Sequence, residues 1–214
     1  MHIPDGFISP ITYIPAYAAS AVLWYIASKK VEIDSQNVSF LATLSALSFV
    51  FMMIAIPLPG GTSAHLSGIA LLALIFGPWL SFVAASLVLV VEALIFGEGG
   101  VTTLGINILA IAFVGSFSSY YVYKVLKRRN ETLAIFLAGW VGVNLSAVFI
   151  AFLLGIQPII ASIDGKPLFF PFDIKTTTLA IMVPHMLIGL VEGAVTVILY
   201  RFLKKNFKVM FDDR

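Results

Sequence analysis

Few residues in this chain can bind a metal ion, and one of them stands at an unusual place. The chain has three histidines and no cysteine, and it begins MHIPDG. With histidine at position 2, the Met1 amine, the His2 amide nitrogen and a His2 ring nitrogen can close two fused chelate rings around one metal ion. His65, in the loop GGTSAHLSG, is the candidate for a fourth nitrogen. A square of nitrogens favours Ni²⁺ or Cu²⁺ over Zn²⁺, which prefers a tetrahedron, and over Mg²⁺, which prefers oxygen.

The alternative is that His2 belongs to a disordered tail, as N-terminal residues often do. Pro4 and Gly6 argue against this alternative because they indicate a turn in the tail. The chelate also requires a free amine at Met1. Aminopeptidases generally remove the initiator methionine when the second residue is small, and histidine is not small. The first segment also lacks the pattern of a signal peptide. We therefore expect the mature chain to begin at Met1.

Four further polar residues are candidates for supporting roles around the metal. Asp5 would either offset the charge of the ion or cap a turn. Ser63 is either a supporting hydroxyl or a loop cap. Asn107 would hydrogen-bond a ligand imidazole or join two helices. His185 is either a packed helix histidine bonded to a neighbour or a transient ligand.

Composition places the chain in the membrane class. Its residues are 60% hydrophobic and 11% charged, whereas ordinary globular domains are about a quarter charged. The net charge of only +2 carries no nucleic-acid footprint, so no nucleic-acid partner is expected. The lack of cysteine excludes disulfides, thiolate metal sites and thiol nucleophiles.

The apolar runs predict an all-α integral membrane protein of seven helices, one of them short. A span needs about 20 apolar residues. The run 66–96 is divided at Gly77-Pro78, because proline disfavours helix before it and starts a new helix readily. The predicted helices are 11–28, 38–57, 66–76, 78–96, 103–123, 132–155 and 176–203, and 156–175 is predicted to be a loop. Together they form one membrane domain, 1–214, behind a metal-capture segment, 1–10.

The basic residues predict the orientation of this multi-pass protein in the cell membrane. With the N-terminus outside, eleven of the thirteen lysines and arginines face the cytoplasm, and only Lys166 and Lys175 face outward. The C-terminus is then cytoplasmic. The segments that carry His2 and His65 share the outer face. Glu92 and Glu192 fall inside predicted spans, where ionisable groups are costly and usually face the protein interior, and their roles stay open.

Four motifs extend this interpretation. MHIPDGFISP, PLPGGTSAHLSG, FGEGGVTTLGIN and PHMLIGLVEG follow one another as in the substrate-capture subunit (S component, or M subunit) of cobalt and nickel energy-coupling-factor ABC transporters, which this chain resembles over nearly its whole length. The resemblance implies an N-terminus tucked into the fold, with Ni²⁺ or Co²⁺ held by Met1, His2 and His65 as the transported substrate. In one motif the family usually reads GANxxNM, whereas this chain reads GINILAIAF, so Asn107 matches and the second Asn-Met pair is absent.

The resemblance also implies partners. These are a transmembrane coupling (T) subunit, cytoplasmic ATPase subunits and a small accessory membrane subunit. Ala42 and Ala46, in a stretch of small residues four apart, are the candidates for docking the coupling subunit. The chain has no GxxxxGK[ST] loop, so we expect a protein that is not an enzyme, takes no organic cofactor and depends on other subunits for ATP.

Two other functions stay open at this point. An intramembrane metal-dependent enzyme would use His65, His185 and one of the glutamates, but the chain lacks the HExxH spacing that presents two ligands and a base on one helix face. A self-contained secondary metal transporter would show internal repeats, and none is clear. Only the capture subunit requires a free α-amine.

Overall fold

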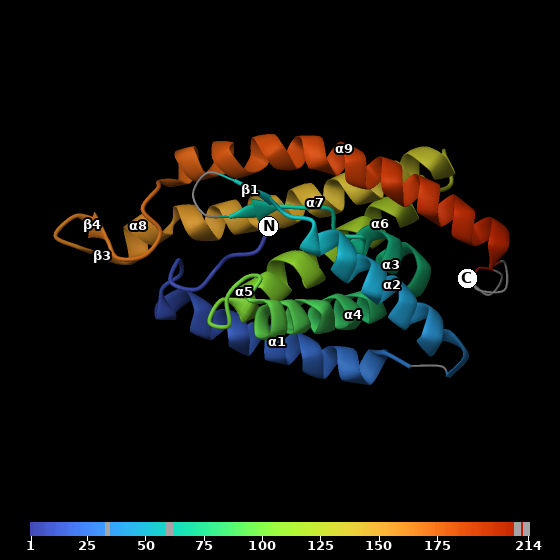
Figure 1. Cartoon of the computed structure of the whole chain (residues 1–214), viewed down its shortest axis with the longest axis horizontal. Coiled ribbons are helices and arrows are strands. Elements are labelled where there is room, and N and C mark those ends of the chain that lie inside the picture. The colour runs from blue at the N-terminus through green and yellow to red at the C-terminus, as the bar shows by residue number, and fades with distance from the viewer. Residues whose placement is uncertain (33–34, 59–61, 208–210, 212–214) are drawn as a thin grey trace.

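The computed structural model describes residues 1–32, 35–58, 62–207 and 211, and for 35–37 it describes the backbone alone. In this part of the chain, consecutive helical segments form seven rods and one short extra helix (Figure 1). The rods are α1 (Pro10–Lys30), α2 (Ser35–Met53), α3 (Ile69–Phe76), α4 (Pro78–Val91) with η1 (Glu92–Phe96), α5 (Leu104–Asn107) with η2 (Ile108–Val114) and α6 (Gly115–Leu126), α7 (Glu131–Gly155), and α9 (Ile174–Asn206); the extra helix is α8 (Gln157–Ile160).

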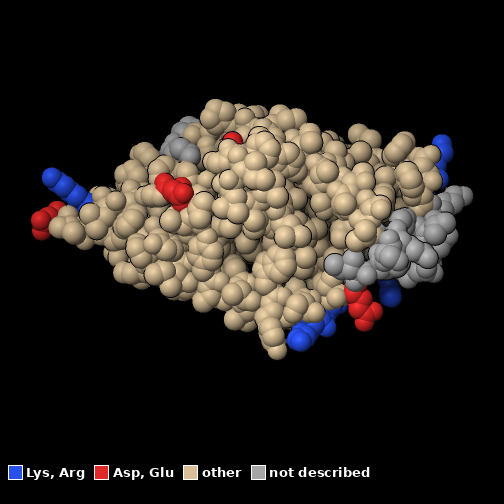
Figure 2. Space-filling model, turned by 60° about the horizontal axis from the view of Figure 1, so that its bottom comes forward, with Lys and Arg blue, Asp and Glu red and all other residues tan. Residues whose placement is uncertain are grey.

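The all-α membrane class is confirmed. Within the described residues, five helical stretches are long and apolar enough to cross a membrane, and α2 adds a shorter apolar helix over Val38–Met53. On the face drawn in Figure 2, charged side chains lie mainly toward the two ends, and a broad uncharged surface separates them. Such a surface suits hydrocarbon, which offers no water to a charged group.

Small residues let the two longest helices, α7 and α9, pack side by side (Figure 1). A side chain at Gly139 would lie 2.9 Å from the Cα of Gly193, which is closer than real contacts allow. Gly189 and Gly193 are four residues apart on α9, the spacing that permits close helix contact in membranes. This pair of helices forms one wall behind the N-terminal tail.

The second and third predicted helices need correction. The helix predicted over 38–57 ends at Met53, and Ile56–Pro57 instead forms strand β1, paired with β2 (Ser63–Ala64) in an antiparallel hairpin. The helix predicted over 66–76 begins only at Ile69, because Gly68 has the left-handed φ of +66° and the residues before it are held by a side chain of α9. The stretch 65–68 therefore lies outside the helix, and His65 stands at its start.

The remaining boundaries differ for local reasons. The predicted helices 78–96 and 103–123 each contain a π-helical stretch, η1 and η2, and π turns are frequent at functional sites. The predicted loop 156–175 contains α8 and a second hairpin of β3 (Ser162–Ile163) and β4 (Lys166–Pro167), which projects from one end of the molecule (Figure 1). The helices predicted over 11–28, 132–155 and 176–203 are each extended by one to three residues at one or both ends.

Candidate metal centre

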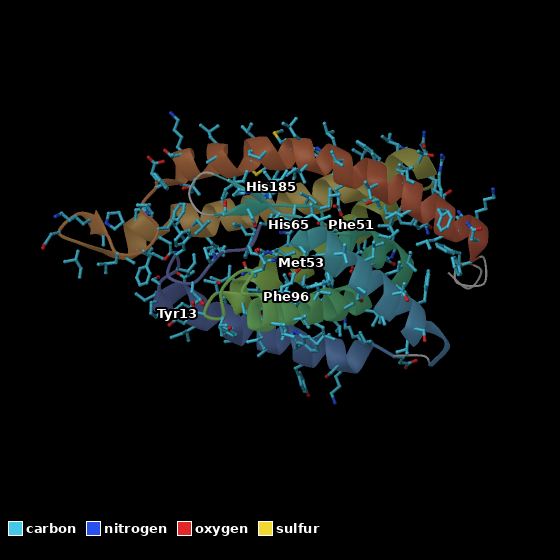
Figure 3. All side chains as sticks on the ribbon, in the orientation of Figure 1. Tyr13, Phe51, Met53, His65, Phe96 and His185 are labelled. Carbon is cyan, nitrogen blue, oxygen red and sulfur yellow. The ribbon has the colours of Figure 1, made fainter. Side chains whose placement is uncertain are left out.

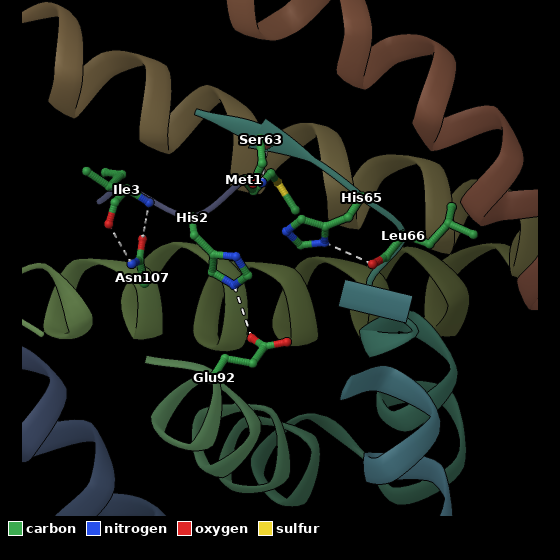
Figure 4. Close-up of polar contacts among 8 residues, drawn as sticks. All are labelled: Met1, His2, Ile3, Ser63, His65, Leu66, Glu92 and Asn107. Atoms are coloured by element: carbon green, nitrogen blue, oxygen red, sulfur yellow. Dashed lines mark hydrogen bonds and ion pairs between the residues drawn. The ribbon is translucent and has the colours of Figure 1, made fainter. Parts of the chain in front are cut away.

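The N-terminal tail is buried inside the helical domain. The exposed fractions of Met1, His2 and Ile3 are 2%, 4% and 0%. Asn107, where α5 passes into η2, accepts a hydrogen bond from Ile3 N at 3.0 Å and donates from Nδ2 to Ile3 O at 3.2 Å (Figure 4). Gly100 N donates to the same carbonyl at 3.0 Å. The main-chain N–H and C=O of Ile3 are thus paired within the protein, as buried main-chain groups generally are.

The glycine-rich loop after η1 makes room for the tail. An added Cβ at Gly99, whose φ is +77°, would lie 3.2 Å from the Cβ of His2, and one at Gly100 would collide with Asp5. The Asp5 carboxylate accepts hydrogen bonds from Val101 N at 3.1 Å and Thr102 N at 2.8 Å. Burial raises the pKa of Asp5, but hydrogen bonds from Thr102 and Val101 outweigh it and leave this pKa below its ordinary value. Asp5 therefore anchors the tail to this loop.

The three predicted metal ligands lie together. The imidazoles of His2 and His65 stack with ring centroids 4.7 Å apart and planes inclined by 20°. The Met1 amine contacts the carbonyl oxygen of Ser63 and lies 3.3 Å from its hydroxyl. The β1–β2 hairpin brings Ser63 and His65 to the tail, and Ser63 thus lies beside the amine as a supporting residue would (Figure 4).

A hydrogen bond assigns the tautomer of His65, and a carboxyl contact that of His2. His65 Nδ1 lies 2.9 Å from the Leu66 carbonyl, so it carries the proton and leaves Nε2 with a free lone pair. Neither ring nitrogen of His2 has a hydrogen-bond partner among the described residues, but Nε2 lies 3.2 Å from Glu92 Oε2, and from this contact we assign the proton to Nε2 and the free lone pair to Nδ1. His2 Nδ1 and His65 Nε2 are both buried. Nδ1 is also the His2 nitrogen nearer the backbone, where a fused chelate ring needs it.

Burial keeps these nitrogens neutral. It lowers the pKa of the Met1 amine from 8.0 to about 4 and that of His2 from 6.5 to about 3. The pKa of His65 is held well below 6.5, first by burial and then by the nearby amine and His2. Neutral amines and imidazoles present lone pairs, which are what a metal ion binds.

Glu92 is a supporting residue that the sequence alone did not assign. Its side chain is fully buried at the start of η1, and its carboxylate faces His2. A carboxylate on the far nitrogen of a ligating imidazole fixes the ring's tautomer and orientation, and metal sites commonly have one. The only sequence signal was the ionisable residue near the end of an apolar span.

Glu192 holds the segment that carries His65. Its two carboxylate oxygens accept hydrogen bonds from Ser67 N at 2.8 Å, Gly68 N at 2.9 Å and Ser67 Oγ at 3.0 Å. Those backbone groups would otherwise be unpaired donors at the start of α3. The glutamate therefore ties α9 to the loop that positions His65.

His185 is buried on the same helix, α9. Figure 3 shows it with His65 in the interior of the molecule. Its Nδ1 lies 2.7 Å from the carbonyl of Ile181, one turn earlier, so it makes the local helix contact of a packed histidine. Its Nε2 is buried without a hydrogen-bond partner among the described residues. It is not in ring contact with His2 or His65.

A side-chain metal cluster is not found in the described ranges. No group of three or more His, Cys, Asp and Glu side chains is placed there to hold an ion. A metal site built on His2 and His65 thus needs main-chain nitrogen. A cavity of about 340 Å³ reaches His2 from the surface between the β1–β2 hairpin and the loop after η1, with Glu98 in its wall.

Comparison with known proteins agrees with the fold. A family model described as the cobalt uptake substrate-specific transmembrane region matches residues 2–209. The fused nickel transport protein NikMN of Rhodobacter capsulatus is 36% identical over an alignment of 216 positions that covers 96% of this chain and 62% of that protein, so this chain spans less than two thirds of its length. A putative metal transport protein of Methanocaldococcus jannaschii is 34% identical over 100% of this chain and 96% of its own.

Solved structures show the same similarity. The crystal structure of a truncated transition metal transporter superposes with a TM-score of 0.92 at 36% identity, covering 96% of this chain and 99% of that one. A second transition metal transporter also has a TM-score of 0.92, at 37% identity, and 93% of it is covered. With a family model matched over nearly its whole length, this multi-pass membrane protein belongs to the CbiM family, the substrate-specific transmembrane regions of cobalt uptake.

Proposed function

We propose that the chain is the metal-capture subunit of an energy-coupling-factor importer for Ni²⁺ or Co²⁺. The ion would enter from the outer face and bind the Met1 amine, the His2 amide nitrogen, His2 Nδ1 and His65 Nε2. The observation that carries this proposal is that one amine and two imidazoles lie together in the protein interior. Neither His2 Nδ1 nor His65 Nε2 has a hydrogen-bond partner among the described residues.

The nitrogen donors explain the choice of metal class. Four nitrogens, one of them a deprotonated amide, suit a late divalent transition metal and do not suit Mg²⁺ or Ca²⁺, which bind oxygen. The relatives named as nickel and cobalt transport proteins support the same class. A hydrolytic enzyme is less well supported, because His185 Nδ1 is engaged by the Ile181 carbonyl of its own helix and no group of three or more His, Cys, Asp and Glu side chains among the described residues is placed to hold an ion.

The proposal includes partners, because the chain has no phosphate-binding loop. An apolar groove of about 520 Å³ runs between α2 and α4, and Ala42 and Ala46 line it. This groove supports the expectation that a transmembrane coupling subunit docks there, with cytoplasmic ATPases and a small accessory subunit completing the importer. The cell membrane is the site of action.

The decisive experiment extends the chain by four glycines ahead of Met1, because a single added residue would let its own amine form a new chelate with the Met1 and His2 amides. The four residues turn the Met1 α-amine into an amide and place the new amine too far from His2 to close fused chelate rings with it, so Ni²⁺ affinity measured by calorimetry should fall more than about 100-fold, beyond the loss usual for supporting residues. The matched control inserts four glycines between Asp164 and Gly165, in the exposed β3–β4 turn. Equal, tight binding by the extended protein would refute the amine's role.

A second set of variants tests the imidazoles. His2→Ala and His65→Ala each remove one donor, and we expect a similar loss of Ni²⁺ and Co²⁺ affinity with folding retained. His185→Ala is the comparison, because it also removes a buried imidazole but not a proposed ligand. If His185→Ala weakened binding as much as the other two, the assignment of four donors would be wrong.

A further inference from the structure

A second cavity lies at the opposite end of the fold from the metal centre. It encloses about 830 Å³ below the end of α3, between the C-terminal ends of α6 and α9. It exists because α3 has only eight residues and the chain reverses at Gly77, whose φ of +81° leaves open space where a side chain would be. The neighbouring helices extend past this reversal and form the walls.

The walls of this cavity carry an excess of positive charge. Lys124, Lys127, Arg128 and Lys204 line it, and Glu131 is the carboxylate among the lining residues. Lys204 pairs with Glu131 at 2.6 Å. The other three cations make no ion pair with a carboxylate in the described part of the chain. One paired cation and three unpaired ones therefore face one space.

Aromatic side chains hold these cations in place. The ammonium groups of Lys124, Lys127 and Lys204 lie 5.4 to 5.9 Å from the ring centroids of tyrosines on their own helices. Two of these tyrosines, Tyr123 and Tyr200, line the cavity, and their hydroxyls hydrogen-bond to each other at 3.0 Å. Basic residues are common on the cytoplasmic side of membrane proteins, but this tendency does not explain why four of them line one cavity.

We propose that this cavity binds the phosphate of an anionic phospholipid headgroup from the cytoplasmic leaflet. Arg128 supplies a planar pair of donors that matches phosphate oxygens, and the lysines supply point charges. The apolar wall from Leu74 and Ile75 suits the glycerol and the first methylenes of the lipid. Basic pockets between helices on the cytoplasmic side are of the kind that takes anionic headgroups.

The surroundings favour a lipid over free phosphate as the source. Basic residues at the ends of the spans mark the level of the lipid headgroups, and the cavity opens at this level. Lipid phosphate is therefore present there at high local concentration. A divalent cation is excluded as the ligand because three unpaired cations would repel it. This site is independent of the metal centre and of the function proposed for it.

The test replaces two of the unpaired cations and follows lipid binding. Lys127→Gln/Arg128→Gln removes two positive charges from the cavity. The control, Lys29→Gln/Lys30→Gln, removes two charges at the end of α1, where the lysines also lie over aromatic rings, Tyr25 and Trp79. Delipidated full-length protein is titrated with phosphatidylglycerol and with phosphatidylcholine, and bound lipid is counted by native mass spectrometry.

We expect the cavity variant to bind phosphatidylglycerol about 10- to 30-fold more weakly than the wild type, and the control to change little. Phosphatidylcholine binding and Ni²⁺ affinity should be the same in all three proteins. Equal loss in the control, no loss in the cavity variant, or full displacement of the lipid by millimolar inorganic phosphate would overturn the proposal. Loss of coupling-subunit assembly with intact lipid binding would overturn it too, in favour of a protein-docking role.

Discussion

At the scale of single residues, the proposed metal centre depends on groups that are buried without charge. An exposed α-amine is mostly protonated at neutral pH, and a proton occupies the lone pair that a metal needs. Burial of Met1 and His2 removes that competition, because a charged form in the interior would lose its hydration. As a consequence, protonation of these groups at low pH should destabilise the buried arrangement of the tail.

This effect predicts how the stability of the metal-free protein depends on pH. The unfolded chain takes up protons at the amine near pH 8.0 and at His2 near pH 6.5, whereas the folded chain does so only near 4 and 3. The contribution of these two groups to the free energy of unfolding should therefore be largest above pH 8 and should decrease as the pH drops toward 4. His2→Asn removes one of these groups, so its melting temperature should change less steeply between pH 7 and 4. Parallel curves for the two proteins would contradict the buried, neutral imidazole.

Glu92 gives a second prediction at this scale. Its carboxylate lies 3.2 Å from His2 Nε2 and would favour the tautomer that directs Nδ1 to the metal. Glu92→Gln keeps an oxygen acceptor for the ring N–H but adds an amide donor, so Ni²⁺ affinity should fall by about tenfold, and Glu92→Ala should lose about 100-fold. Glu131→Gln, at the other end of the fold, is the control carboxylate. Unchanged affinity in Glu92→Ala would show that the carboxylate does not orient the ring.

At the scale of elements, the site is built where regular helix is interrupted. The segment 65–68 stays outside α3, α4 passes into π-helical η1 at Glu92, and α5 passes into η2 after Asn107. Each interruption presents a ligand or a supporting group to the buried tail. The elements that hold them together come from distant parts of the sequence, and α9 contributes through Glu192.

The link between α9 and the His65 segment can be tested directly. Glu192→Gln places an amide donor against a backbone donor of Ser67 or Gly68, and we expect a loss of about 1–3 kcal/mol of stability together with weaker Ni²⁺ binding. Thr196→Ala is the control on the same helix, since its hydroxyl bonds only to the carbonyl of residue 192. The measurements are thermal unfolding and calorimetry. A loss of stability with unchanged metal affinity would mean that Glu192 does not position His65.

At the scale of the whole molecule, the two ends have different chemistry. Nitrogen donors for a cation lie beneath the outer loops, and a basic cavity lies at the cytoplasmic end. The uncharged surface between them suits the bilayer (Figure 2). The sequence contains no GxxxxGK[ST] phosphate-binding loop, and the proposed function therefore assigns the energy for uphill transport to other subunits.

This arrangement predicts that the isolated chain binds metal but does not concentrate it. In liposomes with ATP supplied inside and outside, radioactive nickel should associate with the protein at one ion per chain and should not accumulate above the external concentration. The same chain reconstituted with its coupling and ATPase subunits should accumulate it. ATP-driven accumulation by this chain alone would refute the proposed dependence on partners.

Local patterns in the sequence determined much of this protein. In hydrocarbon, a run of about 20 apolar residues satisfies its backbone groups by forming a helix. The spans and the break at Gly77-Pro78 could therefore be predicted from residues close together in the chain. The fused chelate at Met1 and His2 is local too, because its donors are covalent neighbours. His65 was predicted as their partner from its loop, and the tertiary structure brings it into ring contact with His2.

Only the tertiary structure decided the supporting contacts. Asn107 and Asp5 were candidates for supporting roles, and the structure shows the contacts that they make: Asn107 holds the main chain of Ile3, and Asp5 holds a loop at Val101 and Thr102. Glu92 meets His2 from ninety residues away. Helix 38–57 ended early and helix 66–76 began late because strand pairing and Glu192 took their backbone groups. Periodicity reports the neighbours of a residue along its own helix, whereas these contacts depend on which distant segments pack together.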